Sequence, residues 1–275
     1  MVTIGYEATG LLDGGQLAAR EAVREVVTSG FRPLDALLPA GGVRRGSLIE
    51  WLAGGAGAAG GMAGAGAMSL AGAVACRLAR TGDEPGTIVV VDRTGWFHPP
   101  AVLPWLGCGA EVARLVVARP AHDDDEIWAI DQALRCAGVA AVLAWPRATA
   151  SPGGGLVAGR RCAAQSWTIA MRRWQLAARS SGAVGLFVRP ATARGEPSWA
   201  EARIAVAPSP GGTLLERRLQ LTRVGGAWAG DADVGEPAVD VVLDMARGTA
   251  GALRHRGAAG VARAFESREA ACRAS

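Results

Sequence analysis

The chain has 275 residues and no lysine, so all 29 of its basic residues are arginine. Its length is typical of one large domain with short appendages. The net charge of +4 arises in residues 245–275, which hold six arginines and two glutamates, so the preceding part of the chain is neutral overall. This distribution excludes a main body with the broad basic surface that binds nucleic-acid phosphates.

The sequence also gives no indication of a metal site, a membrane-spanning segment or a signal peptide. The five cysteines and three histidines lack the clustered spacing of a zinc site. Between Glu50 and Arg77 lie 26 uncharged residues, but most are Gly or Ala and would not drive membrane insertion. The first fifteen residues lack the apolar core of a signal peptide. We therefore expect a cytoplasmic protein with no membrane segment and no metal.

The first half of the chain alternates between predicted helices and strands. Residues 16–27 predict an amphipathic helix that ends at Thr28-Ser29-Gly30. An apolar strand at 47–52 leads into a Gly/Ala-rich loop, which a helix at about 66–80 follows. Residues 87–92 (TIVVVD) give the clearest strand, because a continuous β-branched run is typical of a buried parallel strand.

The alternation continues to about residue 188. A strand is expected at 115–117, and the acidic run 123–126 favours a helix N-terminus over a cation site. A strand at 139–145, a helix at 167–179 and a strand at 184–188 follow. This alternation predicts an α/β fold with a mostly parallel sheet and helices on both faces.

The pattern becomes antiparallel after Pro197. Residues 202–207 and 214–223 flank a Ser-Pro-Gly-Gly turn and predict a hairpin that extends the sheet, with a last strand at 237–243. We divide the chain into three parts: an N-terminal helical arm (1–29), a core (30–244) and a basic, flexible C-terminal tail (245–275).

Four segments carry a resemblance to a known family. They are 29–38 (SGFRPLDALL), 41–50 (GGVRRGSLIE), 91–100 (VDRTGWFHPP) and 219–226 (LQLTRVGG). Over roughly residues 28–226 the chain resembles RecA-type cores, and it is most similar to ImuA, the RecA-like accessory protein of bacterial damage-induced mutagenesis. The resemblance implies a RecA-like core with a phosphate-binding loop after the first core strand.

The positions that would make such a core an ATPase carry other residues. The loop corresponds to Gly54, Gly55, Gly57, Ala59 and Gly60, with Ala59 where the lysine that binds the β- and γ-phosphates is expected. Thr94 stands at the position of the water-activating carboxylate, and Trp145 at that of the magnesium-directing Asp. The resemblance therefore predicts a degenerate phosphate loop, no ATPase activity and no cofactor.

Two nucleotide-binding alternatives remain open. Backbone N–H groups of the glycine loop would allow residual ATP binding without a lysine. Residues 55–60 also match G-x-G-x-x-G, but a dinucleotide site needs an acidic residue about 20 positions further on. That residue must stand at the end of the next strand, and the first candidate there, Asp92, lies 32 positions after Gly60. Asp92 itself is interpreted either as a surviving nucleotide-site residue or as the cap of the next turn.

The family resemblance implies a non-catalytic adaptor in translesion DNA synthesis. ImuA-like proteins act with ImuB, an inactive relative of Y-family polymerases, and through it with an error-prone DnaE-type polymerase. RecA is a further expected partner, which the helical arm at 16–27 would contact. The DNA-binding loops of RecA correspond to about 149–161 and 190–198, and the second is too short to hold DNA. Direct DNA binding is therefore expected to be weak or absent.

Two regions are candidates for partner contacts. Trp96 lies in a Gly-Trp-Phe-His-Pro-Pro segment and is either an exposed anchor or, like most of the nine tryptophans, part of the core. The tail has too little apolar content to fold alone, so we expect it to order on ImuB, with direct DNA binding as the rival interpretation. Its proposed contact residues are Arg247, Arg254, Arg256, Arg263 and Phe265.

Overall fold

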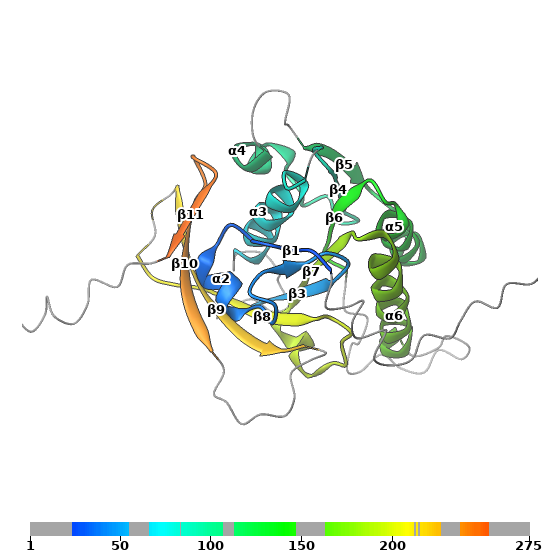
Figure 1. The fold of residues 1–275 in the computed structure, drawn as a ribbon. Coiled ribbons are helices and arrows are strands. Elements are labelled where there is room, and N and C mark those ends of the chain that lie inside the picture. Colours follow the sequence, from blue (N-terminus) through cyan, green and yellow to red (C-terminus); the bar gives the residue numbers. More distant parts are fainter. Residues whose placement is uncertain are drawn as a thin grey trace, which may run out of the picture.

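The described part of the chain folds around a nine-stranded sheet with helices on both faces (Figure 1). The computed structural model describes residues 24–54, 66–82, 84–106, 113–146, 163–211, 213, 215–226 and 237–252. The strand order is β11-β10-β9-β8-β3-β7-β6-β4-β5. These strands are β3 (Leu48–Ala53), β4 (Thr87–Val91), β5 (Arg114–Ala118), β6 (Val139–Ala144), β7 (Val184–Pro190), β8 (Ala202–Pro208), β9 (Glu216–Gly225), β10 (Ala238–Asp244) and β11 (Thr249–Ala252).

The pairing confirms the predicted α/β class. Strands β5, β4, β6, β7, β3 and β8 pair in parallel. Strands β8, β9, β10 and β11 pair antiparallel and extend the sheet at its C-terminal side. β4 lies inside the sheet between β6 and β5, as its uninterrupted run of β-branched residues predicts.

Helices cover the two faces of the sheet with separate apolar clusters. On one face lie α2 (Arg32–Leu37), α3 (Ala67–Ala79) and α4 (Leu103–Leu106), which follows the short 3-10 turn η1 (Pro99–Val102). On the other face α5 (Asp123–Arg135) and α6 (Ala163–Ser181) lie side by side (Figure 1). Burial on both faces explains why β3, β6 and most of β7 contain so few polar residues.

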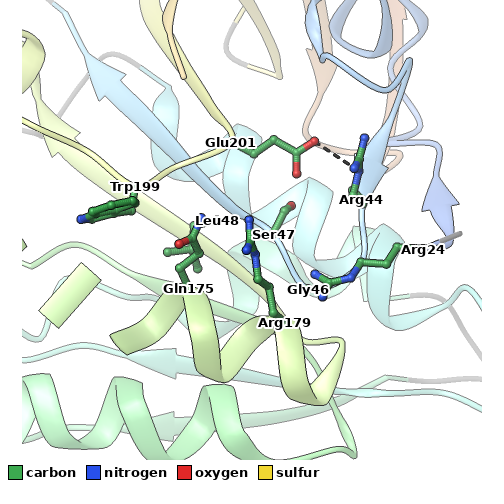
Figure 2. A pocket seen from close by; sticks show the side chains of 9 residues that line it. All are labelled: Arg24, Arg44, Gly46, Ser47, Leu48, Gln175, Arg179, Trp199 and Glu201. Carbon is green, nitrogen blue, oxygen red and sulfur yellow. Dashed lines mark ion pairs between the residues drawn. The ribbon is translucent and has the colours of Figure 1, made fainter. Parts of the chain in front are cut away.

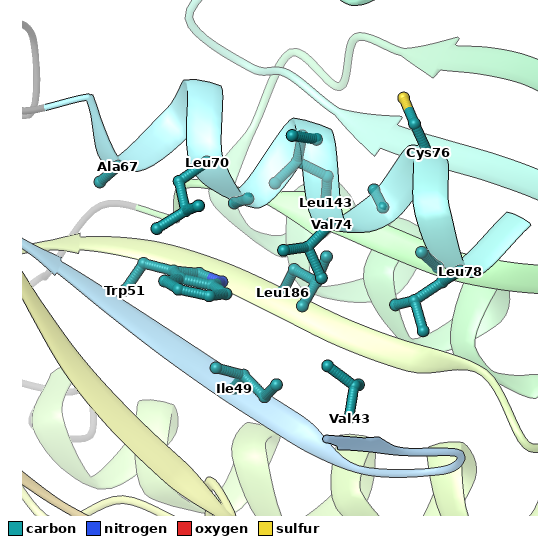
Figure 3. Packing of buried hydrophobic residues seen from close by; sticks show 14 of the residues in the cluster. Val43, Ile49, Trp51, Ala67, Leu70, Val74, Cys76, Leu78, Leu143 and Leu186 are labelled. Carbon is teal, nitrogen blue, oxygen red and sulfur yellow. The ribbon is translucent and has the colours of Figure 1, made fainter. Parts of the chain in front are cut away.

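The cluster beneath α3 is built from small helical and large strand residues. Figure 3 shows Trp51 and Ile49 of β3 beneath Leu70 and Val74 of α3 (Figure 3). The alanine-rich helix approaches the sheet closely, and the indole of Trp51 fills the volume that its short side chains leave. Close packing of this kind is what an Ala-rich chain needs to bury enough apolar surface.

The predicted helical arm is wrong where the structure describes it. Val26–Val27 forms strand β1, which pairs antiparallel with β2 (Val43–Arg44). Residues 1–23, which hold most of the predicted helix, lie outside the described residues. The two valines are β-branched and pair with β2, which follows α2 in the chain, so this pairing overrides the helical pattern.

The S-G…L-D motif of the sequence is a structural turn. The Asp35 carboxylate accepts hydrogen bonds from the Ser29 backbone N–H at 2.8 Å and the Thr28 hydroxyl at 2.6 Å. This fixes the chain entering α2, a helix that the sequence analysis did not predict. Pro33 in its first turn was the available signal.

The sheet extends past the predicted start of the tail. Asp244 accepts hydrogen bonds from the backbone N–H groups of Arg247 and Ala246, each at 3.0 Å, and these bonds hold the pKa of its carboxyl below the ordinary value. Gly248 then adopts a positive φ of 62° against the carbonyl of Pro104, where no side chain fits. Residues 249–252 return as β11, so the part described as a tail begins later than residue 245.

Candidate functional site

The carboxyl ends of the parallel strands form the edge where open α/β sheets bind ligands. Gly54 follows β3 at this edge, and its backbone N–H donates to the Val206 carbonyl at 2.9 Å. The predicted loop positions Gly55, Gly57, Ala59 and Gly60 lie outside the described residues. The described chain resumes at Gly66, one residue before α3 begins.

The N-terminus of α3 is closely packed. Gly66 has φ of 78°, and a Cβ at this position would come within 2.5 Å of the Leu219 side chain on β9. A phosphate-binding lysine normally starts the helix after the loop, but α3 starts at Ala67, eight residues after the predicted lysine position Ala59, and the chain has no lysine. Leu219 therefore borders the place where a phosphate would approach the helix.

Two predicted positions, Thr94 and Trp145, meet at this edge. The indole N–H of Trp145 donates to the Thr94 hydroxyl at 2.9 Å, and the ring lies 6.2 Å from that of Phe97. Trp145 is only 1% exposed. The two positions assigned to lost carboxylates are thus filled by a hydrogen-bonded, largely apolar pair between the ends of β4 and β6.

The hydrogen bond of Trp145 distinguishes it from other buried tryptophans. No hydrogen-bond partner among the described residues was found for the indole N–H groups of Trp51, Trp105, Trp167 and Trp174. Burying an unpaired N–H costs free energy. Thr94 therefore gives the Trp145 ring a defined orientation that packing alone does not enforce.

Asp92 shapes the turn that follows β4. Its buried carboxylate accepts hydrogen bonds from the backbone N–H groups of Trp96 at 3.1 Å and Phe97 at 2.9 Å, and from the Thr94 hydroxyl at 3.1 Å. Arg119 lies 3.9 Å away on the exposed side. Of the two interpretations of Asp92, this geometry supports the capping role.

Trp96 is exposed, as an anchor for a partner must be. Its side chain is 48% exposed on the turn held by Asp92, so the backbone beneath it is rigidly positioned. Trp96 lies two residues after Thr94 in the chain. Arg247, the described member of the predicted tail contacts, lies on the β10–β11 turn, where it is exposed and pairs with Asp244 at 3.3 Å. The other predicted tail residues, Arg254, Arg256, Arg263 and Phe265, lie outside the described part of the chain.

A buried ionic cluster lies behind the edge and was not predicted. Glu50, in the middle of β3, accepts from Arg189 of β7 at 3.1 Å and from Arg203 of β8 at 2.7 Å. Arg189 also pairs with Glu196 and lies 4.3 Å from the centre of the Trp167 ring. The signal in the sequence was one charged residue in each of three otherwise apolar strands.

Arg203 of the same cluster also holds residues 190–198, the segment predicted to correspond to the second DNA-binding loop of RecA. Residues Ala191–Gly195 form the 3-10 turn η3, and Arg203 donates to the carbonyls of Ala193 at 2.6 Å and Arg194 at 2.9 Å. A turn that is hydrogen-bonded back onto the sheet in this way is ordered without any ligand. The first predicted loop, 149–161, lies outside the described residues.

A small polar cavity lies at the opposite, amino end of β3. Its volume is about 20 Å³, room for about one water molecule and far less than a nucleotide needs. Figure 2 shows arginine side chains around it and the pair Arg44–Glu201, 3.4 Å apart (Figure 2). Its lining residues are Arg24, Arg44, Gly46, Ser47, Leu48, Gln175, Arg179, Trp199 and Glu201.

Other reactive groups in the described structure are few. Burial raises the pKa of the Cys76 thiol to about 12, so this thiol stays protonated and is a poor nucleophile. Within the described ranges no group of three or more His, Cys, Asp or Glu residues is placed to hold a metal ion. No helix in the described part of the chain is both long and apolar enough to cross a membrane.

Comparison with known proteins gives no family assignment. Neither a scan against protein-family models nor a search of curated proteins found a match for this chain.

Proposed function

We propose that this chain is a non-catalytic, RecA-like adaptor of the ImuA type that acts in translesion DNA synthesis after DNA damage. The observation that carries the proposal is the Thr94–Trp145 pair, which occupies the sheet edge with an indole and a hydroxyl where an ATPase of this type needs carboxylates. The absence of lysine from the whole chain is consistent with it. The sequence resemblance supplies the partners: ImuB, through it a DnaE-type polymerase, and RecA.

A degenerate core suits an adaptor for a physical reason. ATP hydrolysis would drive a cycle of association and release, whereas a core without a lysine, a base or a metal carboxylate has no such cycle. The buried cluster of Glu50, Arg189 and Arg203 and the capped turn at Asp92 keep the sheet edge in one arrangement. Such a chain is suited to holding partners by its surface.

Titration with Mg-ATP tests the chemical part of the proposal. We expect calorimetry to detect no micromolar binding, because no cation of the loop neutralises the β- and γ-phosphates and no carboxylate directs magnesium. The rival is residual binding of an anion through backbone N–H groups at the α3 N-terminus, where the N-cap residue is Gly66 and has no side chain. Micromolar binding of Mg-ATP would contradict the proposal, and binding of NAD instead would favour the dinucleotide alternative.

Co-purification with the ImuB protein of the same genome tests the adaptor role. We expect the full chain to retain ImuB and a chain lacking residues 253–275 to lose it, since these residues carry most of the net charge and all of the proposed tail contacts except Arg247. Ending the chain at Ala252 keeps β11 and the turn at Asp244 intact. A full-length variant that carries Arg254→Gln, Arg256→Gln and Arg263→Gln tests the charge of the tail without shortening the chain.

The outcomes of this experiment are distinct. If the full chain binds neither ImuB nor RecA, the adaptor proposal is wrong. If the shortened chain keeps ImuB but loses single-stranded DNA, with steep salt dependence in the full chain, the tail is a DNA-binding segment instead.

A further inference from the structure

The outer face of α6 is cationic and carries exposed apolar side chains. The helix has 19 residues and none is acidic; of its three arginines, Arg173 pairs with Asp131 of α5 at 3.4 Å, and the other two are Arg172 and Arg179. Ile169 and Leu176 are about half exposed, at 49% and 51%. They lie seven residues apart, so both are on the solvent side, opposite the buried Trp167, Met171 and Trp174.

Arg172 stands between these two apolar side chains and keeps its positive charge. It donates to the amide oxygen of Gln175, and its guanidinium lies 4.5 Å from the centre of the Trp199 ring. Both partners are neutral, so they hold the guanidinium in position without cancelling its charge. A fixed, exposed cation loses little side-chain entropy when it pairs with an acidic group.

The cationic face continues into the cavity at the amino end of β3. Gln175, Arg179 and Trp199 line this cavity, and Leu176 lies between Arg172 and Arg179 on the helix surface. Figure 2 shows Arg179 and Gln175 reaching up from α6 toward Ser47, with Arg24 and Arg44 entering from the other side (Figure 2). Three arginines and one glutamate line the cavity, so its charge is positive overall.

We propose that this surface, formed by Ile169, Arg172, Leu176, Arg179 and Trp199, binds an acidic amphipathic segment of a partner protein. Charge complementarity selects the partner: its carboxylates pair with Arg172, and its apolar side chains cover Ile169 and Leu176. Exposed, fixed Trp and Arg side chains are the types that dominate binding free energy at protein interfaces. The surface is distinct from the basic tail and does not depend on the tail contact with ImuB.

The test uses a fluorescein-labelled helical peptide of about 15 residues, with glutamates on one side and leucines on the other. We expect saturable binding to the full chain, measured by fluorescence anisotropy, that weakens as salt is raised. Arg172→Glu and Leu176→Glu should each weaken it about tenfold or more. Both sites are exposed, so circular dichroism should show an unchanged fold, and Arg217→Glu on exposed β9 is the matched control.

Three results would overturn the proposal. One is no saturable binding of the acidic peptide at low salt. A second is equal loss for Arg217→Glu and Arg172→Glu, which would show a non-specific charge effect. The third is binding of labelled single-stranded DNA that Arg172→Glu abolishes while peptide binding is unchanged, which would make this face a nucleic-acid surface.

Discussion

Glu50→Ala is expected to lower the free energy of unfolding by about 3–5 kcal/mol, because it leaves buried guanidinium groups without their shared carboxylate. Glu50 is fully buried and accepts hydrogen bonds from both Arg189 and Arg203. Arg189 is itself only 1% exposed, so water does not replace the lost partner. Urea unfolding followed by circular dichroism measures the loss as a lower transition midpoint.

Two further variants show whether the stability loss of Glu50→Ala comes from the buried carboxylate. Glu50→Gln keeps an acceptor oxygen of the same shape and should cost less than Glu50→Ala. Asp123→Ala removes the exposed partner of Arg93 and should cost at most about 1 kcal/mol. A loss for Glu50→Ala no greater than that for Asp123→Ala would mean that the cluster does not stabilise the sheet.

The strands of the parallel sheet were predictable because their environment is simple. β4 and β6 are buried on both faces, and such strands need continuous apolar sequence. The turn between β8 and β9 was predictable from Ser209, Pro210 and Gly211, whose preferences are local. In these elements burial and turn chemistry act within a few residues, and the pattern of the chain indicated them correctly.

The elements that were missed depend on distant partners or very short segments. β1 has two residues and exists because Val43–Arg44 lies beside it. β11 was included in the predicted flexible tail, whereas the turn before it is fixed by the Asp244 carboxylate and by the close approach of Gly248 to Pro104. An Asp whose side chain bonds the backbone about two residues further on is a turn signal, and Asp244 gave it in the sequence.

In the candidate site, too, single residues could be predicted from the sequence but their contacts with distant residues could not. Thr94 and Trp145 were singled out by resemblance to an ATPase, but nothing in the sequence indicated that they bond to each other across 51 residues. The Glu50 cluster joins residues separated by 139 and 153 positions. Contacts of this kind follow from strand order, which the predicted elements alone did not specify.

The second large effect is expected for Trp145→Ala, which should lower the free energy of unfolding by about 3–5 kcal/mol. The indole fills the space between the ends of β4 and β6 and packs near Phe97, so its removal leaves a cavity in the main apolar cluster. The Thr94 hydroxyl also loses its donor. Trp128→Ala, which removes a 63% exposed tryptophan from α5, is the matched control and should cost about 1 kcal/mol or less.

The hydrogen bond and the packing of Trp145 are separable. Thr94→Val keeps the volume of the side chain but leaves the buried indole N–H unpaired, so it should cost about 1–3 kcal/mol. Combining Thr94→Val with Trp145→Phe removes both polar groups, and its cost should be less than the sum of the two single changes. None of these variants should gain Mg-ATP binding, because opening the edge supplies neither a lysine nor a carboxylate. A loss for Trp145→Ala that only matches Trp128→Ala would mean that the indole does not close this edge, and the argument against a nucleotide site would then rest on the missing lysine alone.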